Sequence, residues 1–279
     1  MNYVIIDDII KNALLEDRVY DDITTESITS PDSQAEVDLI AKEHGKICGL
    51  NVFSRVFQIL GDVDINFLKK EGELVKKGEI IAKLRGSTKI LLSGERVALN
   101  LLQRMSGIAT AAYNASEILK EYGIKVLDTR KTTPGLRYLE KYSVLTGGGF
   151  NHRFDLSDMA MVKDNHILAA GGIKNAVQMI RKRHPFIKKI EVEAENLEQV
   201  KEAVEAKADI IMLDNMGDEL LKECIGYIKG RAIIEVSGNM DATRLQNLKK
   251  LKIDYVSMGK LTHSVKALDI SMKNLKIIK

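Results

Sequence analysis

Short apolar segments, each followed by a polar residue or glycine, recur through the second half of this chain. Six of them can be read in order as IKVL, MAMV, KIEV, DIIML, AIIEV and YVSMG. From Glu193 onward the residues that end these segments lie 20 to 23 positions apart, the length of one strand, one helix and two short loops. Because strands that are apolar throughout are buried on both faces, as in parallel sheets, the pattern predicts an array of parallel βα units.

The segments between these strands are predicted to be helices. Asn196, Asp218 and Asp241 precede helix-like stretches and are expected to be N-caps. The chain after residue 105 has room for six or seven strands, fewer than the eight of a complete barrel. We therefore expect an α/β fold with an incomplete, six- to seven-stranded α/β barrel over residues 106–269.

Residues 1–105 read differently, as a small domain of mixed helix and strand. Ile5, Ile9, Leu14 and Leu15 recur at near-helical spacing. The stretches AEVDLIAKEHGKICGL and GELVKKGEIIAKLRG alternate apolar and polar residues around glycines, which indicates short strands and turns. A long helix is expected to follow and to end at Gly123.

Composition narrows the class of protein. The content of 45% apolar and 29% charged residues is that of a soluble globular protein. No apolar run reaches the roughly 18 residues of a membrane span, and the start of the chain is acidic where a signal peptide is basic. We therefore expect a cytoplasmic protein without membrane partners. Cys48 and Cys224 stand far apart, which argues against a disulfide or a zinc site.

The net charge of +3 does not predict a nucleic-acid partner. The chain has eight tyrosines, six phenylalanines and no tryptophan, which leaves few surfaces for base stacking. A phosphate- or nucleic-acid-binding module without activity is the alternative of another class. Tight, strongly salt-dependent DNA binding without turnover would favour it.

The polar residues at the strand ends are the candidate site, because the carboxyl ends of parallel strands face a common cavity. We expect the cavity to contain Arg130, Lys131, His152, Arg153, Lys163, Glu193 and Asp214. Arginine binds carboxylates and phosphates with two hydrogen bonds, and lysine acts on phosphate as a point charge. This set of cations predicts a substrate with several negative charges.

Two carboxylates among these cations suggest a metal ion. Glu193 and Asp214 could hold Mg²⁺ beside a bound phosphate, directly or through water. Glu191 lies two positions before Glu193, and we expect one of the two to face the cavity and the other to form an ion pair outside, with spacing favouring Glu193.

Small residues end the last two strands, in VSGNM and SMGKLTHS. Glycine lets the backbone approach a ligand closely, and amides at the start of a helix favour a phosphate. The residues expected to bind phosphate are Ser237, Gly238, Asn239, Ser257 and Gly259.

Each of these residues also has an ordinary structural interpretation. A single Arg or Lys after a strand is more often a solvated loop charge, and Asp128 could simply brace its own loop. Thr132 and Thr133 could be turn residues before a proline. His166 and His263 could equally be loop histidines. The recurrence of polar residues at six strand ends favours the site.

Arg104, in contrast, lies inside an apolar helical stretch and requires an anionic partner.

Seven stretches of this sequence resemble the quinolinate phosphoribosyltransferase family. They are ERVALNLLQRMSGIAT, DTRKTTPGLR, GGGFNHRFDLSDMAMVKDNH, IEVEAEN, IMLDN, VSGNM and YVSMGKLTHS, in that order. The early DRVYDDITTES is also similar to a family element. Two departures are Val97, where the family often has threonine, and Asn239, where a second glycine is common.

The resemblance implies a fold and a reaction. The fold is an N-terminal open-faced α/β sandwich over residues 1–105, joined by residues 270–279, followed by an incomplete α/β barrel. The reaction is that of a pentosyltransferase in NAD biosynthesis: quinolinate and phosphoribosyl pyrophosphate give nicotinate mononucleotide, pyrophosphate and CO₂, with Mg²⁺ as the cofactor.

The resemblance also implies roles for the site residues. Arg130, His152 and Arg153 bind the two carboxylates of quinolinate, with Lys163 nearby. Lys131 reaches toward the phosphoribosyl donor, whose ribose and Mg²⁺-pyrophosphate face Glu193 and Asp214. The catalytic set is then Lys131, Lys163, Glu193 and Asp214, and the 5-phosphate is bound by Ser237, Gly238, Ser257 and Gly259.

Finally, the resemblance implies a homodimer in which Arg104 reaches into the site of the neighbouring subunit; a hexamer is a further assembly of this kind.

Two enzymes of the same fold are the alternatives to this function: nicotinate phosphoribosyltransferase and a molybdenum-operon pyrophosphorylase-like protein. Arg130 with His152 and Arg153 favours a dicarboxylate over nicotinate.

Overall fold

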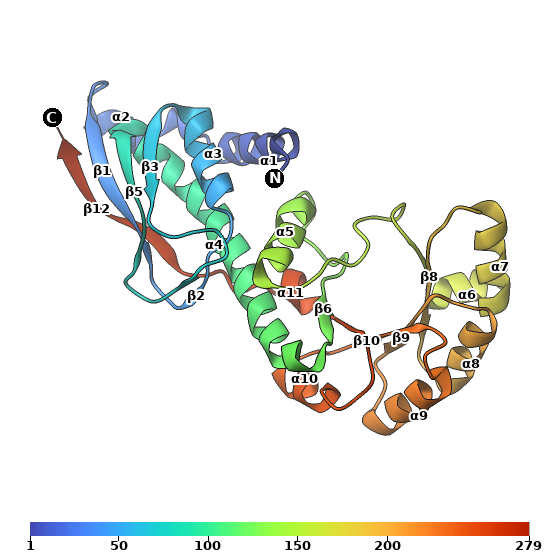
Figure 1. The fold of residues 1–279 in the computed structure, drawn as a ribbon. Coiled ribbons are helices and arrows are strands. Elements are labelled where there is room, and N and C mark those ends of the chain that lie inside the picture. The colour runs from blue at the N-terminus through green and yellow to red at the C-terminus, as the bar shows by residue number, and fades with distance from the viewer. Residues whose placement is uncertain (279) are drawn as a thin grey trace. The chain divides into compact units, whose positions relative to one another are not determined.

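The computed structural model describes residues 1–278, which form two compact units (Figure 1). The first unit comprises residues 1–113, 132–148 and 262–278. The second comprises residues 114–131 and 149–261. Residues 132–148 therefore belong to the first unit, although the sequence predicted a barrel domain over residues 106–269.

A four-stranded antiparallel sheet with helices on one face forms the first unit (Figure 1). The strand order is β12-β1-β5-β3. Its strands are β1 (Gln34–Ala41), β3 (Val63–Phe67), β5 (Ile80–Ser87) and β12 (Ile270–Ile278), and β2 (Gly45–Lys46) pairs separately with β4 (Leu74–Val75). Its helices are α1 (Tyr3–Glu16), η1 (Val19–Asp21), α2 (Ile23–Ile28), α3 (Leu50–Leu60) and α5 (Arg137–Gly147).

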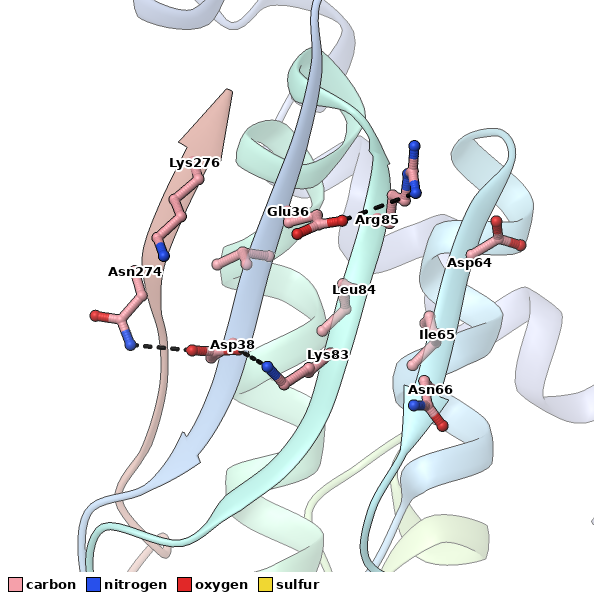
Figure 2. Close-up of a pocket in the computed structure, with 11 residues that line it drawn as sticks. Glu36, Asp38, Asp64, Ile65, Asn66, Lys83, Leu84, Arg85, Asn274 and Lys276 are labelled. Atoms are coloured by element: carbon pink, nitrogen blue, oxygen red, sulfur yellow. Dashed lines mark hydrogen bonds and ion pairs between the residues drawn. The ribbon is translucent and has the colours of Figure 1, made fainter. Parts of the chain in front are cut away.

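Burial alternates along β1, so one face of this sheet is packed and the other is open to solvent. Ala35, Val37 and Leu39 point into the core, while Glu36 and Asp38 lie on the open face (Figure 2). The core also contains Phe53 and other apolar side chains from the helices. The unit is therefore the small α/β domain expected at the N-terminus.

Helix α4 (Thr88–Leu119) begins in the first unit and ends in the second. It begins earlier than the sequence suggested and is extended by η2 (Lys120–Tyr122), which Gly123 ends in the left-handed conformation with φ 70°. The expected end of this long helix is thereby confirmed.

The second unit is built on a six-stranded parallel sheet in the order β6-β11-β10-β9-β8-β7. The strands are β6 (Lys125–Leu127), β7 (Ala160–Val162), β8 (Ile190–Ala194), β9 (Ile210–Asp214), β10 (Ile233–Ser237) and β11 (Tyr255–Ser257). Among residues 1–278 no ladder joins β7 to β6, and Phe150 forms an isolated parallel bridge with Leu127 of β6. The expected α/β fold, with a parallel six-stranded sheet and a small N-terminal domain, is confirmed.

Helices connect these strands in the βα rhythm read from the sequence. They are α6 (Asp164–Ala170), α7 (Ile173–Arg183), α8 (Leu197–Glu205), α9 (Asp218–Ile228) and α10 (Ala242–Leu248), and α11 (Lys260–His263) comes after β11, the last of these strands in the sequence. Four residues of β9 are buried in succession, as a sheet covered on both faces requires.

Two of the three expected N-caps are confirmed. Asn196 accepts a hydrogen bond from the backbone N–H of Gln199, and Asp241 accepts one from that of Arg244. The expectation for Asp218 was wrong: α9 starts at this residue, and extended Gly217 occupies the cap position. Asp218 instead forms an ion pair with Arg244.

Candidate active site

A pocket of about 310 Å³ lies at the carboxyl ends of the parallel strands, within the second unit. Strand ends and the loops that follow them supply its walls. Its lining residues are Thr129, Arg130, Lys131, His152, Arg153, Met161, Lys163, Glu193, Met212, Asp214, Glu235, Ser237 and Ser257. All seven charged or imidazole residues that the sequence predicted for the cavity are in this set.

A larger hollow, of about 500 Å³, lies over the open face of the sheet in the first unit (Figure 2). Its charges are mixed: Arg85 lies 3.9 Å from Glu36, and Lys83 lies 3.9 Å from Asp38. Asp38 also accepts a hydrogen bond from Asn274. Because its lining contains as many acids as bases, this hollow lacks the excess of cations that an anionic substrate needs, and we take the pocket at the strand ends as the site.

Two arginines give the pocket its positive charge. Arg153 is 9% exposed and donates from Nη1 to the carbonyl oxygen of Met159 at 3.0 Å. Burial lowers the pKa of Arg153, the charge of Arg130 lowers it further, and Glu191 acts in the opposite direction. The Nε of Arg130 is buried without a hydrogen-bond partner. Two crowded guanidinium groups, one with an unsatisfied donor, are a site for an anion.

On the other side of the pocket, Lys163 pairs with Glu193. Lys163 follows β7, and Glu193 lies on the neighbouring strand β8. Asp214, the last residue of β9, accepts a hydrogen bond from the side chain of Asn215 at 2.8 Å. Oxygen ligands of this kind suit Mg²⁺, and both Glu193 and Asp214 line the pocket.

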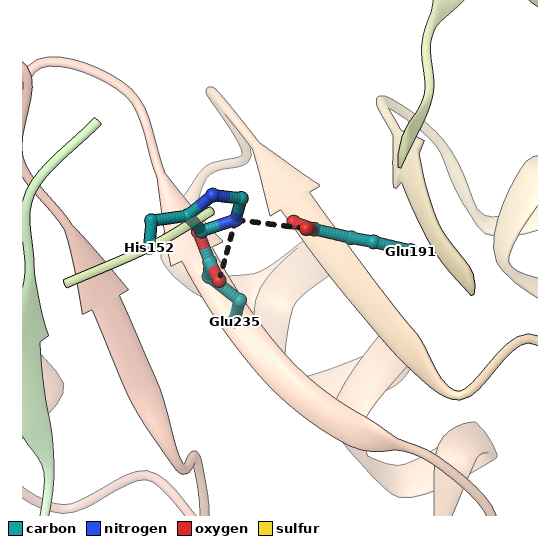
Figure 3. Close-up of side chains that lie close together, drawn as sticks. All are labelled: His152, Glu191 and Glu235. Carbon is teal, nitrogen blue, oxygen red and sulfur yellow. Dashed lines mark hydrogen bonds and ion pairs between the residues drawn. The ribbon is translucent and has the colours of Figure 1, made fainter. Parts of the chain in front are cut away.

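His152 is held from two directions. Its backbone N–H donates to Oδ1 of Asp128 at 2.9 Å, and its Nε2 lies 2.8 Å from Oε2 of Glu191 (Figure 3). Asp128 is fully buried, so it braces the loop that carries His152.

Glu193 lines the pocket and Glu191 does not, as the spacing favoured, but the partner of Glu191 is His152 of the pocket and not a group outside it. Residues two apart on a strand point to the same side, and Glu191 lies on the same side of β8 as Glu193, one step deeper. Its side chain is fully buried against His152. Glu235 on β10 was missed altogether, although it stands two positions before Ser237, a strand-end residue that was identified. Met161, Met212 and Thr129 were also missed.

The two segments expected to bind phosphate contribute one serine each to the pocket, Ser237 and Ser257. Gly238 has φ 99°, and a Cβ added there would lie 2.1 Å from Oδ1 and 2.8 Å from the backbone N of Asn215. Glycine is therefore required at this turn. Asn239 reaches Oδ1 of Asn215 at 3.4 Å. Gly238, Asn239 and Gly259 themselves do not line the pocket.

Arg104 belongs to the first unit, and its expected anionic partner is Glu140. Its Nε and Nη2 donate to Oε1 of Glu140 at 2.9 and 2.6 Å, and Nη2 also donates to Oγ1 of Thr133 at 2.6 Å. Thr133 is therefore more than a turn residue. Thr132 accepts a hydrogen bond from Arg137.

The remaining histidines and cysteines have local contacts. His166 accepts the backbone N–H of Lys163 at Nδ1, which braces that loop. His263 lies 2.7 Å from the hydroxyl of Ser264. Cys48 and Cys224 are free and buried. Burial raises the pKa of the Cys48 thiol.

Within residues 1–278, no helix has the length and apolar character needed to cross a membrane.

The fold and the pocket together define an α/β protein with a pocket rich in cationic side chains at the carboxyl ends of a parallel sheet. Comparison with protein families gives a more specific result. Residues 22–106 match the N-terminal domain of quinolinate phosphoribosyl transferase, and residues 108–273 match its C-terminal domain. A probable nicotinate-nucleotide pyrophosphorylase (carboxylating) of Bacillus subtilis is 44% identical over 273 residues, covering 98% of this chain and 94% of the relative.

Solved structures agree with this result. NadC from Streptococcus pyogenes is 47% identical and superimposes with a TM-score of 0.95, covering 100% of this chain and 99% of that one. The nicotinate-nucleotide pyrophosphorylase from Francisella tularensis is 35% identical, with a TM-score of 0.93 and coverage of 100% and 98%. This chain belongs to the quinolinate phosphoribosyltransferase family.

Proposed function

We propose that this chain is a pentosyltransferase that joins quinolinate to phosphoribosyl pyrophosphate and releases nicotinate mononucleotide, pyrophosphate and CO₂. The observation that carries the proposal is the pair Arg130 and Arg153 beside His152 in one pocket. Three nitrogen-bearing side chains on one wall suit a substrate with two adjacent carboxylates. Membership of the family supports the same reaction, which is a step of NAD biosynthesis. We propose that the chain carries it out in the cytoplasm.

The two substrates are assigned to different walls. Quinolinate lies against Arg130, His152 and Arg153, which hold its carboxylates and orient its ring nitrogen. Lys163 lies nearby, Lys131 reaches toward the phosphoribosyl donor, and the two lysines neutralise the charge that develops on the departing pyrophosphate. The anomeric carbon gains positive character as pyrophosphate leaves, and the ring nitrogen attacks it in line. Once ribosylated, the positively charged ring nitrogen stabilises the electron pair that stays on the adjacent ring carbon when its carboxylate leaves as CO₂, and that carbon then takes up a proton to give nicotinate mononucleotide.

The 5-phosphate of the donor is assigned to the ends of the last two strands. Ser237 and Ser257 line the pocket there. The turn at Gly238 and Asn239, together with Gly259, brings backbone amides to the same end of the sheet. Amides in such a turn are suited to a phosphate.

The carboxylates of Glu193 and Asp214 are suited to hold Mg²⁺, because hard cations prefer oxygen ligands. When bound, the ion would neutralise the pyrophosphate group. The ammonium group of Lys163 already contacts Glu193, so this lysine would turn to share the carboxylate with the ion or with the substrate.

We also propose a homodimer in which Arg104 completes the site of the neighbouring subunit, or a hexamer of such dimers. Glu140 and Thr133 orient the Arg104 side chain, which is 31% exposed. A guanidinium that is held firmly and remains partly exposed is suited to bind an anion in the site of the neighbouring subunit.

The experiment is a paired assay. The chain is incubated with phosphoribosyl pyrophosphate and either quinolinate or nicotinate, and nicotinate mononucleotide and released CO₂ are measured. Turnover of quinolinate with equal amounts of both products is expected. Activity on nicotinate alone would overturn the proposal. Omission of Mg²⁺ in the presence of EDTA should abolish turnover. Full activity without the metal would show that the reaction does not require Mg²⁺.

A further inference from the structure

One imidazole and two carboxylates form a buried group at the wall of the pocket (Figure 3). We call His152, Glu191 and Glu235 the histidine–carboxylate cluster. Their side chains are 8%, 0% and 1% exposed. Nε2 of His152 lies 2.8 Å from Oε2 of Glu191 and 3.7 Å from Oε2 of Glu235. Both carboxylates therefore face the same ring nitrogen.

The cluster is poorly explained as a contribution to stability. Each glutamate has a second oxygen, Oε1, that is buried without a hydrogen-bond partner. Burying a carboxylate with an unsatisfied oxygen costs free energy, and apolar residues of similar size are often as stabilising as a buried ion pair. The cost implies that these two glutamates serve the site.

Their positions suit a supporting role. Glu191 lies on β8 and Glu235 on β10, the two neighbours of β9 in the sheet. Glu193 and Ser237, two positions further along the same strands, line the pocket. His152, in contrast, comes from the loop that follows Gly148, which ends α5 in the left-handed conformation. Two rigid strands thus hold a side chain that a loop supplies.

The chemistry of the contact determines what the strands hold. An ionised carboxylate only accepts hydrogen bonds, so Nε2 must carry the hydrogen in its bond to Glu191. An imidazole that also donates to a substrate carboxylate needs a second N–H, which only the imidazolium has. Arg130 and Arg153 also line the pocket and oppose a further positive charge, whereas an ionised Glu191, and Glu235 in its ionised form, favour it.

We propose that Glu191 and Glu235 are positioning residues that fix the ring of His152 through Nε2–H and keep it cationic, so that it can bind a carboxylate of the substrate. This inference rests on the proposed function for the identity of that substrate. It assigns Glu191 and Glu235 a role in binding the dicarboxylate and none in binding the phosphoribosyl donor.

The first part of the test is kinetic. In Glu191→Gln we expect KM for quinolinate to rise by at least about tenfold, the equivalent of one lost charged hydrogen bond. KM for phosphoribosyl pyrophosphate should change by less than about twofold. Glu235→Gln should show the same selectivity with a smaller increase, because its distance to Nε2 is longer.

The chain offers two matched controls. Asp209 accepts the backbone N–H of Ile190 at 2.8 Å, and Asp254 accepts that of Ile234 at 2.8 Å. Each carboxylate thus supports the residue just before one of the two glutamates, at the far end of the strand from the pocket. Asp209→Asn and Asp254→Asn should leave the KM for quinolinate unchanged. An equal rise of both KM values in the glutamate variants, or no rise, would overturn the inference.

The second part needs no active variant. Histidine labelled with ¹⁵N is introduced into the wild-type chain, and the ring signals of His152 are assigned by comparison with His152→Gln. Protonated Nε2 and Nδ1 are expected at pH 7, and a neutral ring with its hydrogen on Nδ1 would overturn the inference. An inactive wild type would overturn the proposed function. An active wild type, together with a Glu191→Gln variant whose KM for quinolinate is unchanged, would overturn this inference alone.

Discussion

The Arg104 guanidinium donates two hydrogen bonds to a single oxygen of Glu140, a carboxylate that is only 1% exposed. The other oxygen of Glu140 accepts the backbone N–H of Thr133 at 3.2 Å. Helices α4 and α5 are thereby joined within the first unit by a charged contact at the edge of an apolar core.

Replacing Arg104 by methionine should destabilise the first unit, because it leaves Glu140 buried without its counter-charge. We expect a loss of about 2 kcal/mol in the free energy of unfolding, below the full value for a buried pair because Arg104 is partly exposed. Urea denaturation measures it. The double variant Arg104→Met with Glu140→Met should recover most of the loss, and a double variant as unstable as the sum of the single ones would contradict the ion pair.

Mixing two inactive variants tests whether Arg104 acts in the neighbouring subunit. Arg104→Ala and Lys163→Ala should each lose activity, and a mixture should recover part of it, since one site of each mixed dimer contains both residues. Subunit exchange is followed with a tagged chain. Arg104→Ala mixed with the double variant Arg104→Ala/Lys163→Ala is the control and should stay inactive. Exchange without recovery would exclude a shared site.

The stability of the chain should depend on pH through Glu235. Burial, followed by the charge of Glu191, raises the pKa of Glu235 from 4.5 to about 7, and His152 opposes this rise. Between these values the folded chain binds a proton that the unfolded chain has lost, so this contribution to stability is present below pH 4.5 and is lost as pH rises toward 7. The loss amounts to at most about 3 kcal/mol.

Glu235→Gln cannot titrate and should therefore become more stable relative to wild type as the pH is raised from 5 to 8. Urea denaturation at several pH values provides the comparison. Glu223→Gln, at an exposed position of α9, should show a constant difference from wild type. A stability difference between Glu235→Gln and wild type that stayed constant with pH would contradict the raised pKa of Glu235.

Gly238→Ala should weaken binding of the phosphoribosyl donor, because the new Cβ would collide with the backbone and side chain of Asn215. We expect KM for phosphoribosyl pyrophosphate to rise more than KM for quinolinate. Gly230→Ala separates crowding from backbone strain, since Gly230 also has a positive φ of 77° but no atom within 4 Å of the added Cβ. Both variants should lose roughly 1 kcal/mol of stability from strain, and only Gly238→Ala should alter KM.

The parallel sheet and most of its pocket could be predicted because burial on both faces makes each strand an apolar run with a clear end. Lys163, Glu193 and Asp214 were identified by their place after such runs, and the structure gathers them in one pocket. Glu235 was missed because it lies inside its run, where a charged residue is exceptional. Its position two before Ser237 was the available signal.

Pairings between distant segments could not be read from the sequence. Arg104 required an anionic partner, but nothing local indicated Glu140, which is 36 positions away. Helix faces were only partly resolved: α1 buries Ile6, Ile10 and Leu14, while Ile5 and Leu15 are exposed at 40% and 66%. In a sequence with apolar residues on several sides of a helix, the packing partner decides which side is buried.

The pairing of β12 with β1 has a consequence for synthesis on the ribosome. Gln34 lies opposite Ile278, so the outer strand of the first sheet emerges after every residue of the second unit. Until then β1 presents an unpaired edge of backbone groups, which is open to pairing with another nascent chain. The second unit is therefore complete before β12, the strand that closes the sheet of the first unit, leaves the exit tunnel.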